Sequence, residues 1–366
     1  MKIFEYISNQ DALNRLIYEI NEDKIIAIDT EFSRNRTYFP ELCLIQLATK
    51  NKLVCIDCLC VEDINVFIDS LFRKNKVLIM HSARQDLDAL YLYSKKRSFT
   101  LIDTQIGASL VGEKAQIGLK PLLDLTLKKN IDKSFTRIDW KKRPLSDDEI
   151  NYAIEDVKYL IPIWNILKSK LIKLDRMSWI EEECERLKAI EPLKNELGLF
   201  LKLKGISSLN EEKKDIAYNL IKWRENKARL LNLPRQWIIG DKQISLIAKK
   251  GLNKKNDFIS IENIPENILE KYGEEIKAEL KNKDNRNSNN YSELFSTSKK
   301  KDFELLNKIA KERSKELNIE NHIFITEKEI SDLSRGLYSE RIKNGWRSKE
   351  INKILQLISK LTNSSE

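Results

Sequence analysis

The sequence Ile25-Ile26-Ala27-Ile28-Asp29-Thr30-Glu31-Phe32 places two carboxylates at the end of an isoleucine-rich run. Such a run is typical of a buried strand, which we expect at residues 25–28. Side chains two residues apart in a strand point to the same face, so Asp29 and Glu31 should project together. Neighbouring carboxylates repel each other unless a cation lies between them, and Mg²⁺ or Mn²⁺ prefers oxygen ligands. The pattern alone also fits a strand that ends in a polar loop, so the rest of the chain has to decide.

The composition predicts a soluble protein with packed cores. The chain has 366 residues, of which 41% are hydrophobic and 33% are charged. This length favours two or three domains. No apolar run is long enough to span a bilayer, and no signal segment follows Met1. We therefore expect a cytoplasmic protein with no membrane partner.

The five cysteines are odd in number and mostly lie in apolar contexts, so we expect them to be reduced. Cys55, Cys58 and Cys60 resemble half of a zinc site. A structural zinc site needs four protein ligands. No second cysteine cluster follows, and His81 and His322 are the only histidines. We therefore expect no structural zinc.

The net charge of +9 is confined to the second half of the chain. Residues 1–200 contain 31 Lys and Arg and 31 Asp and Glu, so residues 201–366 carry the whole excess. A basic half of this kind favours nucleic acid as the partner. A composition that is merely rich in Lys and Asn is the alternative.

The first half alternates between strand-like and helical segments. Apolar spacing predicts helices at 11–19, 64–72 and 86–93, strands at 41–47, 53–56 and 77–80, and a hairpin turn at 50–52. This order predicts an α/β domain with a sheet of mixed strand direction.

Further candidate residues follow in this half. Asp86 stands after a predicted strand at the start of a helix, where a carboxylate also serves as a cap. Ser146 and Glu149 have the spacing of a capping box, which begins another helix. Tyr152 and Asp156 lie one turn apart on that helix, so they share a face and can address one water molecule. Each of them alone also fits an ordinary half-buried or exposed residue.

Taken together, these segments resemble ribonuclease D, a family of 3′–5′ exonucleases with four site carboxylates and a tyrosine. The matching segments are Asp29-Thr30-Glu31-Phe32 with Leu44-Ile45-Gln46-Leu47, His81-Ser82-Ala83 with Asp86-Leu87, Leu101-Ile102-Asp103-Thr104-Gln105, Arg137-x-Asp139-Trp140-x-x-Arg143-Pro144-Leu145, and Tyr152-Ala153-x-x-Asp156. The resemblance covers residues 3–200 in the family's order and spacing. It implies a ribonuclease-H-like α/β exonuclease domain at 1–200, with a mixed sheet flanked by helices.

The resemblance also implies a site for two divalent metal ions, Mg²⁺ or Mn²⁺. Its ligands would be Asp29, Glu31, Asp86 and Asp156. Asp29 would bridge both ions, Glu31 and Asp156 would hold the ion that activates water, and Asp86 would serve the other ion through water. Two such ions can stabilise both the attacking and the leaving oxygen of a phosphodiester. Tyr152 would orient the water, because a free phenol titrates near ~10 and is a poor base at neutral pH.

Four residues near these motifs are candidate substrate contacts. Phe32 would stack on the terminal base, or pack in the core. His81 would lie near the site, or be a hydrogen-bonded core histidine. Arg137 and Arg143 would hold backbone phosphates, or belong to a solvated basic loop. Gln46 lies in an apolar strand and is interpreted as structural.

The second half predicts two small all-α modules after a connector at 193–205. Helical spacing runs through residues 209–231 and ends before Pro234. Trp223-Arg224, Ala228, Asn232-Leu233-Pro234-Arg235 and Trp237 resemble the helicase-and-ribonuclease-D C-terminal (HRDC) domain, a helical nucleic-acid-binding module. We place this module at 206–282.

A second module is expected at 302–366. Residues 283–301 are rich in Asn, Ser and Lys and predict a linker or mobile loop. Arg335-Gly336 and Gly345-Trp346-Arg347 resemble a weaker second copy of the HRDC domain, and an unrelated helical bundle is the alternative.

These features predict a metal-dependent, monomeric 3′–5′ exoribonuclease that releases 5′-mononucleotides from RNA. The family suggests the 3′ ends of precursor tRNA as its substrate. Two alternatives stay open, a DNA 3′–5′ exonuclease and a non-catalytic RNA-binding protein on the same scaffold. The two helical modules favour the RNA enzyme, and the clustered carboxylates argue against a scaffold without catalysis.

Overall fold

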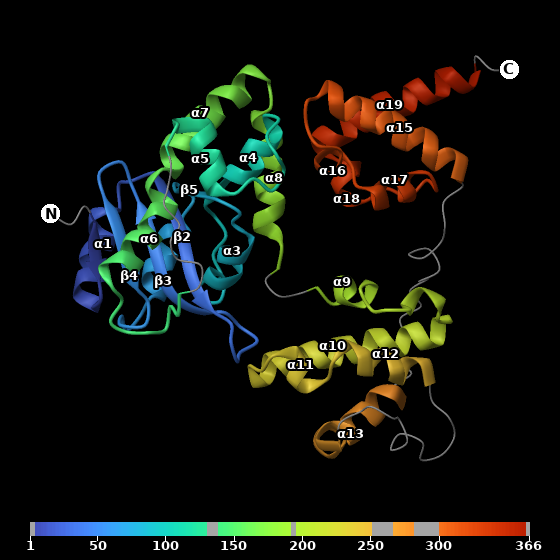
Figure 1. The fold of residues 1–366 in the computed structure, drawn as a ribbon, viewed down its shortest axis with the longest axis horizontal. Helices are drawn as coiled ribbons and strands as arrows, with labels where there is room; N and C mark the ends of the chain where they lie inside the picture. The colour runs from blue at the N-terminus through green and yellow to red at the C-terminus, as the bar shows by residue number, and fades with distance from the viewer. Residues whose placement is uncertain (1–3, 130–137, 192–194, 251–265, 282–299, 364–366) are drawn as a thin grey trace. The chain divides into compact units, whose positions relative to one another are not determined.

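The computed structural model describes residues 4–129, 138–191, 195–250, 266–281 and 300–363, which form two compact units (Figure 1). Unit 1 comprises Met1–Ser33, Leu42–Pro192 and Ser298–Glu366, and unit 2 comprises Arg34–Glu41 and Leu193–Thr297. Within the described ranges, no helix combines the length and the apolarity needed to cross a membrane.

Unit 1 contains the mixed sheet that the sequence predicts. In spatial order its six strands are β1 (Glu5–Ile7), β4 (Leu53–Asp57), β3 (Glu41–Ala48), β2 (Ile25–Ser33), β5 (Val77–Met80) and β6 (Thr100–Asp103). Strand β3 runs antiparallel to β4, whereas β1 is parallel to β4, and β5 is parallel to both β2 and β6.

Strand β2 is central and longer than expected. It runs to Ser33 instead of ending at Ile28, so Asp29 and Glu31 lie inside the strand and not beyond its end. Strand β5 pairs with Ile25–Ala27 at the start of β2, so pairing with the eight-residue strand β3 on the other side is what outweighs the polar composition of the second half of β2. The sheet therefore holds both carboxylates on rigid backbone.

Helices cover the sheet of unit 1. They are α1 (Gln10–Glu19), α2 (Asn65–Leu71), α3 (Arg84–Leu90), α4 (Thr104–Leu110), α5 (Leu119–Leu127), α6 (Asp147–Lys158), α7 (Leu160–Lys173) and α8 (Met177–Ala189). Helix α6, green in Figure 1, packs across the blue strands β2 and β4. It begins at the predicted capping box of Ser146 and Glu149. Its buried Ile150 and Ile154 pack with Leu44 of the sheet, so α6 is fixed both at its N-terminus and along its apolar face.

Unit 2 is helical. Its helices are α9 (Glu196–Leu201), α10 (Glu211–Leu231), α11 (Arg235–Ile238), α12 (Asp241–Lys250) and α13 (Glu266–Lys281). Helix α9 lies in the segment that we expected to be a connector, because Phe200 packs into the core of the unit. At the end of α10, the Asn232 side chain accepts hydrogen bonds from the backbone N–H groups of Tyr38 and Phe39, each at 3.1 Å. These bonds make residues 34–41 part of this unit.

The C-terminal helices are α15 (Lys300–Glu316), α16 (Asn321–Phe324), α17 (Glu327–Leu333), α18 (Glu340–Lys343) and α19 (Gly345–Asn363). Their order repeats that of unit 2: a long helix, an asparagine in the left-handed region, a four-residue helix and another helix. The two asparagines are Asn232 and Asn318, each with φ of 49°. In this correspondence α15 matches α10.

The C-terminal helices pack on helix α8 within unit 1. The indole rings of Trp346 and Trp179 stack with centroids 4.1 Å apart and an interplanar angle of 9°. Arg347, which is 1% exposed, forms an ion pair with Glu183, and the backbone N–H of Trp346 donates to Glu182. The hydrophobic core around the sheet continues into these helices. They are therefore part of the folded unit that contains the sheet.

Replacing Trp346 with alanine should lower the free energy of unfolding of unit 1 by about 3–5 kcal/mol, because it empties a buried aromatic site. Denaturant unfolding followed by circular dichroism measures this change. The control is Trp237→Ala in α11, whose side chain is 55% exposed and whose removal should change stability by less than about 0.5 kcal/mol. Equal effects of the two substitutions would contradict this packing.

Candidate active site

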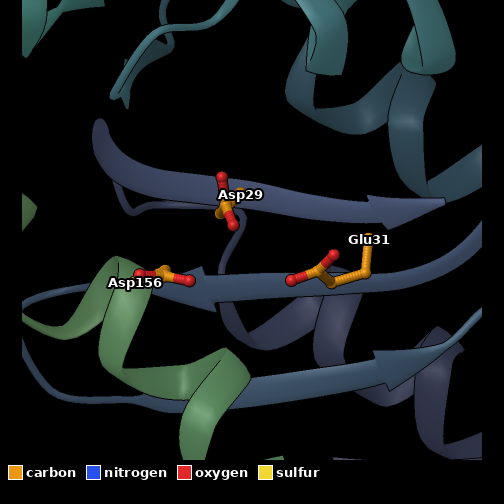
Figure 2. A group of neighbouring side chains, drawn as sticks. All are labelled: Asp29, Glu31 and Asp156. Carbon is orange, nitrogen blue, oxygen red and sulfur yellow. The ribbon is translucent and has the colours of Figure 1, made fainter. Parts of the chain in front are cut away.

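Asp29, Glu31 and Asp156 form one carboxylate cluster. One ligand oxygen from each lies within 4.8 Å of the others, and in the described part of the chain this is the one group of His, Cys, Asp or Glu side chains that gathers in this way. Figure 2 shows the three carboxylates pointing toward a common centre, Asp29 and Glu31 from β2 and Asp156 from α6. The strand alternation and the position of α6 thus produce the cluster that the sequence predicts.

The electrostatics of this cluster are unfavourable without a cation. Burial and the negative charges of Asp86, Asp156 and Glu31 raise the pKa of Asp29 well above its usual value. Each of these causes penalises the ionised carboxylate. A hard divalent cation, which takes carboxylate oxygens as ligands, would remove the penalty. The residues present therefore fit a divalent metal.

Asp86 lies beside the cluster and not within the 4.8 Å group. Its carboxylate accepts a hydrogen bond of 2.6 Å from the buried hydroxyl of Thr30, the residue between Asp29 and Glu31. Burial raises the pKa of Asp86 to about 6, although the Thr30 hydroxyl acts in the opposite direction. Thr30 therefore holds Asp86 next to the strand that carries the other two carboxylates.

The turn between β5 and α3 sets the position of Asp86. Ser82 has a φ of 60°, and the backbone N–H groups of Ser82 and Ala83 donate to the buried carboxylate of Asp103 at 3.0 and 2.8 Å. The same carboxylate caps α4. Asp103 therefore fixes the first turn of α3, where Asp86 lies.

His81 occupies this turn as a hydrogen-bonded residue. Its Nδ1 lies 2.9 Å from the Thr104 hydroxyl, and its Nε2 lies 3.1 Å from the Ile117 carbonyl. Of the two roles considered from sequence, these contacts favour the structural one.

Tyr152 projects from α6 one turn before Asp156. It is half-buried, and its ring stacks on the indole of Trp140 with centroids 6.4 Å apart and an interplanar angle of 30°. Aromatic pairs with ring centroids about 4.5–7 Å apart are stabilising, so Trp140 favours this position of the tyrosine ring. Helix α6 thus carries both a candidate metal ligand, Asp156, and the hydroxyl group that is the candidate for orienting water, that of Tyr152.

Arg143 differs from our expectation of a phosphate contact. Its Nε and Nη2 donate to the two oxygens of Asp57 at 2.5 and 2.7 Å. Its Nη1 donates to the carbonyls of Trp140 and Lys142, both at 2.7 Å. The guanidinium group is therefore occupied by internal partners, and the arginine fastens the segment before α6 to the end of β4.

The remaining candidates have mixed outcomes. Phe32 is half-buried and packs against the core of unit 1, and its role as a substrate contact stays a prediction. Gln46 is fully buried in β3, and neither of its amide atoms has a hydrogen-bond partner among the residues that the structure describes. Arg137 lies outside the described residues.

Sequence reasoning missed four supporting residues: Thr30, Asp57, Asp103 and Trp140. Thr30, Asp103 and Trp140 stand inside the quoted motifs, so their positions there could have marked them as candidates for a supporting role. Asp57 pairs with Arg143 across 86 residues of sequence, and the indole of Trp140 contacts the ring of Tyr152 on the following helix, α6. No local pattern indicates such pairs.

Comparisons with known proteins agree with this geometry. Residues 4–172 match the 3′–5′ exonuclease family and residues 213–280 match the HRDC domain family. The chain is 31% identical to ribonuclease D of Shewanella sp. strain ANA-3, in an alignment that covers 75% of this chain and 71% of that protein. It is 32% identical to ribonuclease D of Desulfotalea psychrophila, in an alignment that covers 75% of this chain and 74% of that protein. The crystal structure of Escherichia coli RNase D, an exoribonuclease involved in structured RNA processing, has the same fold, with a TM-score of 0.80 at 22% identity over 96% of this chain and 98% of that chain.

Asp29→Asn should raise the thermal unfolding midpoint of the metal-free protein at pH 7. An acid whose pKa is higher in the folded than in the unfolded state destabilises the fold above its unfolded pKa, near ~3.9. Asparagine does not ionise, so the gain should shrink as the pH falls toward about 4. Thermal unfolding in EDTA at pH 7 and pH 4.5 measures both effects. The exposed Glu62→Gln is the control, and an Asp29→Asn midpoint at or below wild type at pH 7 would contradict the repulsion.

Proposed function

Because the chain belongs to the ribonuclease D family and is a 3′–5′ exoribonuclease, we propose that Asp29, Glu31, Asp86, Tyr152 and Asp156 perform its reaction with two divalent ions, Mg²⁺ or Mn²⁺. The observation that carries this proposal is the gathering of three carboxylates from β2 and α6 within 4.8 Å. A non-catalytic scaffold has no use for such repulsion. Family membership favours RNA over the DNA exonuclease alternative.

The carboxylates supply the ligands. The charges of Asp86, Asp156 and Glu31 all raise the pKa of Asp29, and this nearness to the other three acids supports Asp29 as the ligand that both ions would share. Glu31 and Asp156 would help to hold one ion, and Asp86, which Thr30 holds beside the strand, would help to hold the other. The ions would supply charge for the phosphoryl oxygens and acidify water.

Tyr152 holds the attacking water in line with the scissile phosphorus. Its position one turn from Asp156 supports this role, because residues four apart lie on the same face of a helix. Orientation is sufficient, since a phenol is a weak base at neutral pH. Phe32, which follows Glu31 in β2, stacks on the terminal base.

The products are 5′-mononucleotides, and we take the substrates to be the 3′ ends of precursor tRNA and other structured RNAs in the cytoplasm. The role of the E. coli relative in structured RNA processing supports this choice. We take the protein to act as a monomer. Matched RNA and DNA oligonucleotides with a labelled 5′ end test the substrate class: a ladder that shortens one nucleotide at a time on RNA and slowly on DNA is expected.

The helical modules hold the RNA backbone. Residues 201–366 carry the whole net charge of +9, and several lysines of unit 2 are exposed. Positive side chains that neutralise phosphates make binding depend on salt. We assign this role to the HRDC module at 206–282, with the C-terminal helices as a second module.

Asp156→Ala should abolish hydrolysis, whereas Tyr152→Phe should be milder. Asp156 is a ligand, and the tyrosine only orients water; positioning groups of this kind contribute ~10²–10⁴ in rate. Single-turnover hydrolysis of a short RNA in saturating Mn²⁺ measures both. If Tyr152→Phe were as inactive as Asp156→Ala, the hydroxyl would be a true base, and full activity would leave the tyrosine without a role.

Removing exposed lysines from unit 2 should flatten the salt dependence of RNA binding. For single-stranded RNA, the log–log slope of affinity against salt should fall by about 0.7 for each phosphate that the protein no longer neutralises. The tested variant replaces three lysines with glutamine at positions Lys222, Lys242 and Lys249. The control makes the same replacement in the neutral half, at Lys24, Lys50 and Lys74. If the two triple variants had equal slopes of affinity against salt, the assignment of RNA binding to the helical module would be contradicted.

A further inference from the structure

Trp140 and Arg143 connect the end of strand β4 to the tyrosine of the site. We propose that they are positioning residues: Arg143, held by Asp57, fixes Trp140 against Tyr152, and this contact sets the orientation of the phenol. The inference rests on the proposed function, in that Tyr152 orients the attacking water.

The first link is the ion pair between Asp57 and Arg143. Asp57 lies at the end of β4 and is 1% exposed, and Arg143 binds both of its oxygens. The Tyr6 hydroxyl also donates to Asp57 at 2.6 Å. Burial alone would raise the pKa of Asp57, but the hydrogen bonds from Arg143 and Tyr6 hold it below its usual value. A bidentate pair of this kind has one favoured geometry, because the planar fork must match the carboxylate.

The second link runs along the backbone before α6. Arg143 Nη1 donates to the Trp140 carbonyl at 2.7 Å, and Nη2 lies 3.3 Å from the Cys43 carbonyl in β3. One guanidinium group therefore binds β4, β3 and the carbonyl of Trp140. Leu145, two residues after the arginine, is buried under α6 with Leu44 and Ile150. The segment 140–145 is thus attached at both of its ends.

The third link is the aromatic contact. The Trp140 indole stacks on the Tyr152 ring, which lies one helical turn from Asp156. The ring of a half-buried tyrosine rotates about χ1 and χ2, and a stacked indole restricts both. A misplacement of about 1 Å at a reacting group lowers the rate about 100-fold, so a residue that acts only through Tyr152 still affects the chemical step.

Trp140→Ala should lower kcat on a short RNA about 10- to 100-fold with little change in KM. Trp140→Phe keeps an aromatic ring on Tyr152 and should recover most of the activity. Arg143→Lys keeps the charge but not the fork, and should lower kcat in the same direction. Asn151→Ala is the matched control, because Asn151 precedes Tyr152 on α6 and is exposed.

A double-mutant cycle separates positioning from general damage. In the Tyr152→Phe background, Trp140→Ala should lower kcat less than about twofold, because its effect passes through the missing hydroxyl. Mn²⁺ affinity measured by calorimetry should be unchanged in Trp140→Ala, because the carboxylates keep their positions. Effects that multiply fully in the double variant, or a large decrease in Mn²⁺ affinity, would overturn the inference.

The cycle also distinguishes this inference from the proposed function. Full activity of Asp29→Asn or of Tyr152→Phe would contradict the proposed site itself. A defective Tyr152→Phe together with a fully active Trp140→Ala would leave the site intact and overturn only the role of Trp140.

Discussion

Repulsion among the site carboxylates is the constraint that the fold of unit 1 has to overcome. Asp29, Glu31 and Asp156 are held within 4.8 Å, with Asp86 close enough to raise the pKa of Asp29 further. The fold can hold them only because each stands on backbone that is fixed by other interactions. Strand β2 lies between two neighbouring strands, α6 has a capping box and an apolar face on the sheet, and Asp103 fixes the turn before α3. The surrounding structure offsets the destabilisation at the site. Such compensation is common at functional sites.

The supporting residues form a layer around the carboxylates. Thr30 holds Asp86, Asp103 holds the turn that carries it, and Asp57 with Arg143 holds the segment that leads into α6. In the same unit, helix α8 packs against α19 through stacked tryptophans and a buried ion pair. The C-terminal helices are thereby part of the folded unit, so a fragment without them would expose the tryptophan face of α8.

Much of the fold and the core of the site could be predicted from the sequence because the relevant signals are local. Alternation in a strand places Asp29 beside Glu31, helical spacing places Tyr152 beside Asp156, and the capping box at Ser146 marks the start of α6. The other features depend on partners distant in sequence. Pairing with β3 extends β2 to Ser33, and Asp57 meets Arg143 across 86 residues. A lone basic residue near a motif does not reveal whether its partner is a phosphate or a buried carboxylate, and for Arg143 it is the carboxylate.

A crystal structure with Mn²⁺ and a short RNA whose terminal linkage cannot be hydrolysed, bound to the Asp29→Asn variant and to the wild-type protein, is the most direct measurement of the central claim. Anomalous scattering locates manganese independently of any assumed ligand. The account predicts, in the wild type, one peak held by Asp29, Glu31 and Asp156 and a second near Asp29 and Asp86, with the RNA 3′ end between them and Tyr152. It predicts weaker or missing peaks in the variant. Manganese bound elsewhere, or an RNA 3′ end far from this cluster, would contradict it.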